Sequence, residues 1–215
     1  HCLVLAPHEF EQDFFVMPEI NLRTNDGKAQ RDELIKVHAG KSLCASDLVE
    51  KAELMAKSVL SHPKASLLSI GRKEAAFFWQ CPYSGLRMKA KLDQSSSQHF
   101  VELKTTRDAN PTEFSKDAFN MHYDLSLVHY RQGLKIVMGV ETPAYFACVE
   151  NDAPFVCEFY PVGGSMLETG HIKWLDAVNK LERAMKTGVW NGYVSDLVDA
   201  PFIESPAWAM KQLLP

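Results

Sequence analysis

An aspartate, a glutamate and a lysine stand near the middle of the sequence, as Asp93, Glu102 and Lys104. The segment 99–105 (HFVELKT) has the composition of a strand, in which residues two apart share a face. Glu102 and Lys104 are therefore expected to project together, with Leu103 on the opposite side. Asp93 closes the preceding strand, and a short polar loop folds the two strands into a hairpin. This hairpin would bring both carboxylates to one lysine-bearing face.

Two neighbouring carboxylates repel each other unless a cation holds them, and their oxygens favour Mg²⁺, for which Mn²⁺ can substitute. A divalent metal lowers the pKa of a bound water and neutralises charge that develops on a phosphodiester. Lys104 would orient that water and stabilise the transition state. The alternative is an amphipathic hairpin whose solvated face carries these charges without a catalytic role, because the spacing D-x8-E-x-K alone is a weak signal.

The neighbourhood of this pattern is cationic although the protein is acidic. The formal net charge of −4 argues weakly against a nucleic-acid-binding protein. Between residues 72 and 107, however, basic residues accumulate: Arg72, Lys73, Arg87, Lys89, Lys91, Lys104 and Arg107. A local surface of this kind can bind phosphate while the rest of the molecule stays acidic. Glu74, on an upstream strand, adds one more acidic group.

The elements around the pattern predict a single α/β domain over residues 1–215. Strands are expected at 74–80, 86–93 and 99–105, with a turn at 81–85 and a polar loop at 94–98. Met88, Ala90 and Leu92 should face the core, and Lys89, Lys91 and Asp93 the other side. Residues 111–139 predict two helices, and 144–150 with 155–161 a second hairpin around Asn151-Asp152.

Further helices are expected at 1–6, 28–39, from Ser46 to just before Pro63, and at 163–187. Leu48, Ala52, Met55 and Val59 would form the buried stripe of the third of these, and Leu175, Val178, Leu181 and Met185 that of the last. An irregular tail with Trp190 and Trp208 follows. The aromatic residues Phe77, Phe78 and Trp79 are expected in the core.

Composition places the chain among soluble globular proteins, with 215 residues, 46% hydrophobic and 23% charged. No apolar run approaches the roughly 20 residues of a membrane span, and no secretory leader is evident, so the expected location is the cytoplasm. The five cysteines show no CxxC spacing, which disfavours zinc ribbons and iron–sulfur clusters and predicts buried reduced thiols. Because the chain starts at His1, a further segment is expected before it.

Several segments together resemble the nuclease domain of exodeoxyribonuclease VIII (RecE), a PDDEXK nuclease related to lambda exonuclease. They are residues 1–10 (HCLVLAPHEF), 23–28 (RTNDGK), 74–93 with its C-P-Y-S-G-L turn and final K-x-K-L-D, 102–106 (ELKTT), and the spacing of Phe119, Tyr123 and Tyr130. The similarity runs in register over nearly the whole chain. Each segment is modest alone, but together they are specific.

The resemblance implies a restriction-endonuclease-like core, a mixed central sheet flanked by helices. It implies a metal-dependent exonuclease that degrades one strand of duplex DNA from its 5′ end and leaves 3′ single-stranded overhangs for a strand-annealing recombinase, in prophage or phage recombination. Homo-oligomeric rings are implied as well, with a tetramer favoured over a trimer. A different PDDEXK endonuclease and a catalytically inactive DNA-binding relative remain the alternatives.

The family roles transfer to particular residues. His1, Asp93, Glu102 and the Leu103 carbonyl would bind the metal, Lys104 would be the catalytic lysine, and Glu74 would lie near the site. DNA contacts are expected from a wider set: Arg23, Lys28, Arg72, Lys89, Lys91, Arg107, Tyr123 and Tyr130. Two positions depart from the family. Ser126 replaces a usual glutamine, and Glu102 stands where close relatives carry aspartate.

Overall fold

The computed structural model describes residues 1–192 and 203–205, so that Trp208 lies outside the described residues. The chain divides into two compact units, His1–Leu175 and Asp176–Pro215. Every site residue predicted from the sequence belongs to the first unit. In the described part of the chain, no helix combines the length and the apolar character that a membrane span requires.

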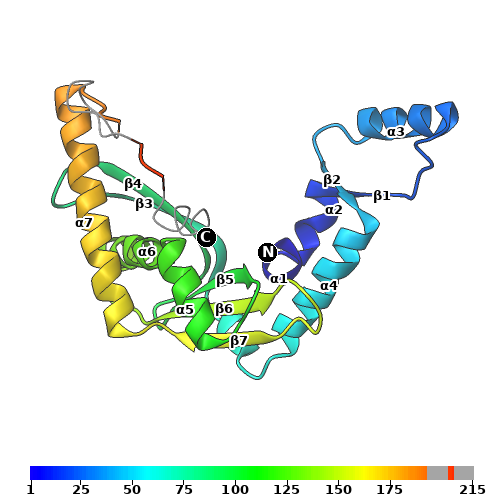
Figure 1. Cartoon of the computed structure of the whole chain (residues 1–215). Coiled ribbons are helices and arrows are strands. Elements are labelled where there is room, and N and C mark those ends of the chain that lie inside the picture. Colours follow the sequence, from blue (N-terminus) through cyan, green and yellow to red (C-terminus); the bar gives the residue numbers. More distant parts are fainter. Residues whose placement is uncertain (193–202, 206–215) are drawn as a thin grey trace, which may run out of the picture. The chain divides into compact units, whose positions relative to one another are not determined.

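A mixed five-stranded sheet forms the centre of the first unit (Figure 1). Its strands, in order across the sheet, are β3 (Arg72–Gln80), β4 (Arg87–Ser95), β5 (Phe100–Thr106), β6 (Ala144–Glu150) and β7 (Cys157–Pro161). The β5–β6 pair is parallel and the other pairs are antiparallel. A parallel pair needs a crossover connection, which here carries α5 (Pro111–Asn120) and α6 (Tyr123–Met138). The predicted α/β class with a mixed sheet is confirmed.

Each face of this sheet has its own hydrophobic core beneath a layer of helices. One core joins α5 and α6 to the sheet: Phe77, Trp79, Leu92, Phe100, Phe114, Leu127, Leu134 and Phe146. The other joins α1 (Cys2–Leu5), α4 (Ser46–Ser61) and the 3-10 helix η2 (Ala65–Leu68) to the opposite face: Val4, Leu5, Ala56, Val59, Leu68, Val101, Leu103 and Phe159. Alternate residues of β5 enter different cores, as strand geometry requires.

The segment between α1 and α4 contains elements that the sequence analysis missed. The 3-10 helix η1 (Pro7–Glu9) and α2 (Phe10–Asp13) lead into β1 (Phe14–Met17), which pairs in parallel with β2 (Ser42–Ala45). Between these strands, α3 (Asn25–Val37) starts three residues before the predicted helix. The start is set by Thr24, whose Oγ1 accepts the Gly27 N–H at 3.1 Å.

Two helices bury the predicted stripes only in part. In α4, Leu48 is exposed, and Val49, Ala56 and Val59 are buried, because α1 packs over the face around Ala56 and Val59. In α7 (Gly164–Thr187), Leu181 and Met185 are exposed, whereas Val178 is buried as predicted.

The buried face of the first turns of α7 is set by close packing against α6. A Cβ added at Gly170 would stand 2.2 Å from the Asp124 carbonyl oxygen, so only glycine allows this approach. Trp174, one turn later, is buried on the same side.

The polar loop predicted at 94–98 is also different. Gln94 and Ser95 extend β4, and both are buried. Ser96 and His99 close the turn through the Ser96 Oγ, which donates to the His99 carbonyl at 2.8 Å and accepts the His99 N–H at 3.0 Å. The His99 Nε2 lies 2.9 Å from the Leu67 carbonyl oxygen, so this histidine has a structural role.

The cysteines match the predicted thiols in part. Cys148 and Cys157 are buried, and burial raises the pKa of each thiol to about 12. Cys2 and Cys44 are free thiols that are only partly buried.

Candidate active site

The predicted carboxylates lie where two strands of the sheet separate. β4 and β5 pair only through Gln94 with Val101 and Ser95 with Phe100. Beyond these pairs, side-chain carboxylates accept hydrogen bonds from the backbone of the neighbouring strand in place of backbone carbonyls. Asp93 Oδ2 accepts the Leu103 N–H at 2.7 Å, and Glu102 Oε1 lies 3.4 Å from the Asp93 nitrogen. Both carboxylates thus lie in the gap where β4 and β5 separate, which we call the fork. There they also accept hydrogen bonds from backbone donors that would otherwise be unpaired.

Lys104 joins this fork from β5, on the same face as Glu102. Its Nζ donates to Glu102 Oε2 at 3.0 Å and stands 5.2 Å from the centre of the Tyr123 ring. Leu103, between them, is buried in the core on the opposite face. Glu102 and Lys104 project together from one face of β5, as predicted, and the ring of Tyr123 at the start of α6 lies beside the ammonium group.

Burial makes the charges in the fork interact strongly. Glu102 is only 3% exposed, and burial together with the charge of Asp93 raises its pKa to about 7. Burial lowers the pKa of Lys104, but the attraction of Glu102 outweighs it, so the net shift is upward. Burial and the negative charge of Glu102 also raise the pKa of Tyr130, which places this α6 residue within electrostatic reach of the site.

Three residues bring potential metal ligands together beside the fork. One ligand atom each from His1, Glu74 and Asp93 lies within 4.8 Å of the others. His1 Nδ1 stands 3.2 Å from Asp93 Oδ1, and this hydrogen bond raises the pKa of His1. The group differs from the predicted ligand set, because it contains Glu74 in place of Glu102.

Glu74 reaches this group through an unusual backbone conformation. It stands opposite Asp93, and the ladder between β3 and β4 skips this pair. Its φ of 52° is the left-handed region, which costs a non-glycine residue on the order of 1–3 kcal/mol. The carboxylate forms an ion pair with Lys91. Strain at an acidic residue beside other ligands favours a functional role for Glu74.

The donor set fits a divalent cation. Carboxylate oxygens with one imidazole nitrogen suit Mn²⁺ and Mg²⁺, and a cation would relieve the repulsion between Asp93 and Glu102. In an extended strand, the N–H and C=O of one residue point to the same neighbour. The Leu103 N–H faces β4, so its carbonyl is directed into the fork as well.

Comparisons with known proteins identify the family and the fold of this chain. A family model described as a PDDEXK-like domain of unknown function matches residues 1–199. The chain belongs to this PDDEXK-like family. A solved structure from Eubacterium rectale, described as "Putative exonuclease", shares the fold with a TM-score of 0.55 and 15% identity, over 86% of this chain and 74% of that one. No curated protein matches the sequence.

The residues predicted to contact DNA fall into two groups in this PDDEXK-like domain. Lys89 and Lys91 lie on the exposed face of β4, Tyr123 and Tyr130 border the fork, and Arg72 and Arg107 are exposed at the start of β3 and after β5. Arg23 and Lys28 instead belong to the segment around α3, and the structure gives neither a contact with the carboxylates.

Gly27, between Arg23 and Lys28, has a packing role. A Cβ at this position would stand 2.1 Å from the Asn21 carbonyl oxygen. The glycine therefore allows the chain to fold tightly over the start of α3.

The sequence analysis missed two features around the site. Phe78, predicted to be buried, is 71% exposed, because it alternates with Phe77 and Trp79, which face the core. Asp124 is fully buried and pairs with Lys173 at 2.8 Å. The alternation on β3 could have indicated the first. No local pattern connects two residues that are 49 positions apart, so the second could not have been found.

Proposed function

We propose that this protein is a metal-dependent exodeoxyribonuclease acting on the ends of double-stranded DNA. The observation that carries the proposal is the fork, in which Asp93, Glu102 and Lys104 meet at the edge of a cationic surface in a domain of the PDDEXK-like family. The family and the fold support a nuclease. The preference for DNA ends rests on the resemblance to RecE.

Each residue of the fork has a separate part in this proposal. A bound Mg²⁺ would supply an activated water and neutralise charge on the phosphate. Asp93 and His1 would hold the metal, with Glu102, Glu74 and the Leu103 carbonyl as further ligands. The Leu103 N–H fixes the orientation of Asp93, and Lys104 places a positive charge where the phosphodiester accumulates negative charge.

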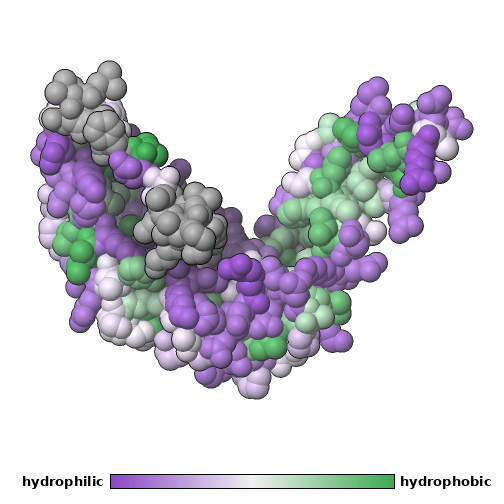
Figure 2. All heavy atoms as spheres, viewed as in Figure 1, coloured by the Kyte–Doolittle hydropathy of each residue, from purple (hydrophilic) through white to green (hydrophobic). Residues whose placement is uncertain are grey.

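The proposal has three further parts. They are digestion from the 5′ end, a strand-annealing recombinase as partner, and a homo-oligomeric ring, preferably a tetramer. An exposed apolar surface supports assembly. Figure 2 shows hydrophobic side chains at the surface over α4 and the β1–β2 pair. Large apolar side chains exposed on these elements are Val16, Leu43, Leu48, Leu54 and Leu60. Light scattering at micromolar concentration should therefore give a mass of three or four chains, and a monomeric mass would contradict the ring.

Duplex DNA labelled separately at each 5′ and 3′ end, with and without Mg²⁺, tests the activity itself. We expect label to be released from 5′ ends only, and only with metal. Covalently closed circular DNA should remain intact, because an exonuclease needs an end, and nicking of the circle would indicate an endonuclease. Glu102→Gln should be inactive. Glu113→Gln, the same change on the exposed surface of α5, should cleave normally. Binding without cleavage by the wild type would indicate an inactive DNA-binding relative.

A further inference from the structure

The exposed ring of Phe78 stands beside two lysines on the outer face of the β3–β4 hairpin. Phe78 pairs with Lys89 and Ala76 with Lys91 in the register of these strands, so all four side chains share one face. Phe78 is 71% exposed. Lys91 is paired with Glu74, whereas Lys89 enters no ion pair among the described residues. An aromatic surface and an unpaired ammonium group are thus next to each other.

These residues line a cavity of about 600 Å³ between the hairpin and α6. Its other walls include Ser126, His129 and Tyr130. No carboxylate from the described residues lines it.

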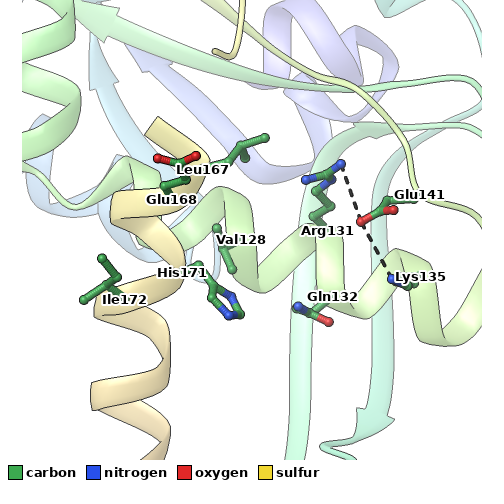
Figure 3. Close-up of a pocket in the computed structure, with 9 residues that line it drawn as sticks. All are labelled: Val128, Arg131, Gln132, Lys135, Glu141, Leu167, Glu168, His171 and Ile172. Carbon is green, nitrogen blue, oxygen red and sulfur yellow. Dashed lines mark ion pairs between the residues drawn. The ribbon is translucent and has the colours of Figure 1, made fainter. Parts of the chain in front are cut away.

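A second cavity, of about 570 Å³ between α6 and α7, differs in this respect (Figure 3). There Glu141 lies 3.5 Å from Arg131 and 3.7 Å from Lys135, so these cations are already paired. Of these two cavities, the one beside Phe78 presents a lysine, Lys89, that no described carboxylate pairs.

The hydrogen bonds of His129 hold the wall of the Phe78 cavity in place. Trp174 Nε1–H donates to His129 Nδ1 at 3.1 Å, so the ring proton lies on Nε2, which donates to the Lys89 carbonyl at 3.0 Å. One imidazole therefore connects α7, α6 and β4. On the next turn of α6, a Cβ at Gly133 would stand 2.7 Å from the Trp79 ring, so the helix and the hairpin are in close contact. The cavity exists before any ligand binds.

Two residues that line this cavity also interact with residues of the candidate active site. Lys91 connects it to Glu74, and Tyr130, which lines it, responds to the charge of Glu102. A ligand that fills the cavity would therefore continue toward the fork.

We propose that this cavity holds one nucleotide of a single-stranded DNA segment next to the scissile phosphate, with its base stacked on Phe78 and its phosphate bound by Lys89. The inference rests on the proposed nuclease function and defines the substrate form at its site as a separated strand. Stacking accepts any base, because every base has a π-face. The site would thus retain a strand without selecting a sequence.

Binding of a 5′-phosphorylated dT oligonucleotide carrying one 2-aminopurine, measured by fluorescence anisotropy in EDTA, tests this inference without cleavage. Phe78→Ala should weaken binding roughly 5- to 100-fold, the usual range for one lost stacking partner. It should also abolish the quenching of 2-aminopurine, and Phe78→Trp should restore both. Lys89→Gln should weaken binding and retain the quenching.

The matched control is Tyr83→Ala, which removes a ring that is 70% exposed at the end of the same hairpin. It should bind like the wild type. Unchanged binding by Phe78→Ala, or an equal loss in Tyr83→Ala, would overturn the inference and leave the exposed ring to a protein partner. The two proposals fail separately. If the wild type does not cleave DNA but Phe78→Ala loses binding, the nuclease proposal fails and the nucleotide site stands.

Discussion

Two buried lysine–carboxylate pairs lie in this domain, and they are built for different purposes. Asp124, fully buried at the start of α6, has both oxygens fully occupied. Oδ1 accepts from the Leu125 N–H and Lys173, and Oδ2 from Thr169 and Lys173. In the fork, each oxygen of Asp93 and Glu102 has one recorded partner, so acceptor capacity remains for a ligand.

The charge balance of the two pairs differs as well. Asp124 and Lys173 neutralise each other one to one, whereas the fork contains two carboxylates, Asp93 and Glu102, beside Lys104. Burial, and after it the negative charge of Asp93, raises the pKa of Glu102. The comparison indicates that the Asp124–Lys173 pair fixes a helix, whereas the carboxylates of the fork keep acceptor capacity for a ligand.

The largest expected effect on cleavage comes from removing the Glu102 carboxylate. Glu102→Gln should abolish cleavage and weaken Mn²⁺ binding, because it removes a charged ligand while keeping the shape. Calorimetric titration above pH 8 measures this, since the pKa of Glu102 is about 7 and protons would compete with the metal at lower pH. Glu74→Gln should be measured in parallel. If only Glu74→Gln loses the metal, the ligand set is His1, Glu74 and Asp93, and Glu102 serves only to hold Lys104.

Substitution of the carboxylate should lower stability at the Asp124–Lys173 pair but not at the Glu102–Lys104 pair. Asp124→Ala should lower the free energy of unfolding by ~3–5 kcal/mol, because it leaves the Lys173 ammonium largely buried without its partner. Urea denaturation monitored by circular dichroism measures the change. Asp176→Ala, which breaks an exposed pair with Lys180, should cost less than ~1 kcal/mol. Equal losses in the two variants would show that burial adds nothing to the Asp124 pair.

Glu102→Gln is the counterpart in the same denaturation experiment. A carboxyl whose pKa is raised from 4.5 to about 7 on folding destabilises the folded state when it ionises, and that cost grows as pH rises between these values. At pH 8 and without metal, the neutral glutamine should therefore leave stability unchanged or raise it. A loss as large as that of Asp124→Ala would mean that both pairs are structural.

Lys104 has a smaller expected effect than Glu102, and it is limited to catalysis. Lys104→Ala should lower single-turnover cleavage by about 10²–10³, the usual loss for one preorganised electrostatic group. Metal affinity above pH 8 should stay the same or rise, because a neighbouring cation has been removed. Cleavage at the wild-type rate would make Lys104 a structural lysine and remove the strongest support for a nuclease.

Local patterns predicted much of this site, because its central residues are close in sequence. Glu102 and Lys104 are two positions apart on one strand, and the hairpin brings Asp93 back beside them, so strand alternation was sufficient. The fork itself was not predictable. It depends on where β4 stops pairing with β5, and β4 continues two residues beyond Asp93.

Tertiary packing determined the parts that sequence patterns missed. The left-handed conformation that turns Glu74 toward His1 leaves no trace in local composition. The buried faces of α4 and α7 depend on α1 and on the close contact at Gly170, so periodicity alone placed Val59 and Val178 correctly but also selected Leu48, Leu181 and Met185, which are exposed. Phe78 was placed in the core because its neighbours belong there, although strict alternation would have exposed it.

The smallest expected effect is on the salt dependence of DNA binding. It distinguishes Lys89, near the fork, from Lys135, between α6 and α7. Among the described residues, no helix carries a cluster of side chains suited to reading base edges, so binding to duplex DNA should be insensitive to sequence and steep in salt. Each phosphate contact contributes about 0.9 to the slope of log K against log salt, so Lys89→Gln should reduce that slope by about one. Lys135→Gln, on the part of α6 that faces α7, should not change it, because this lysine is paired with Glu141.

Arg23→Gln tests the segment around α3 by the same slope of log K against log salt. An unchanged slope there would remove Arg23 from the DNA surface, whereas an equal slope change in all three variants would show that the whole molecule attracts DNA without a defined path to the fork.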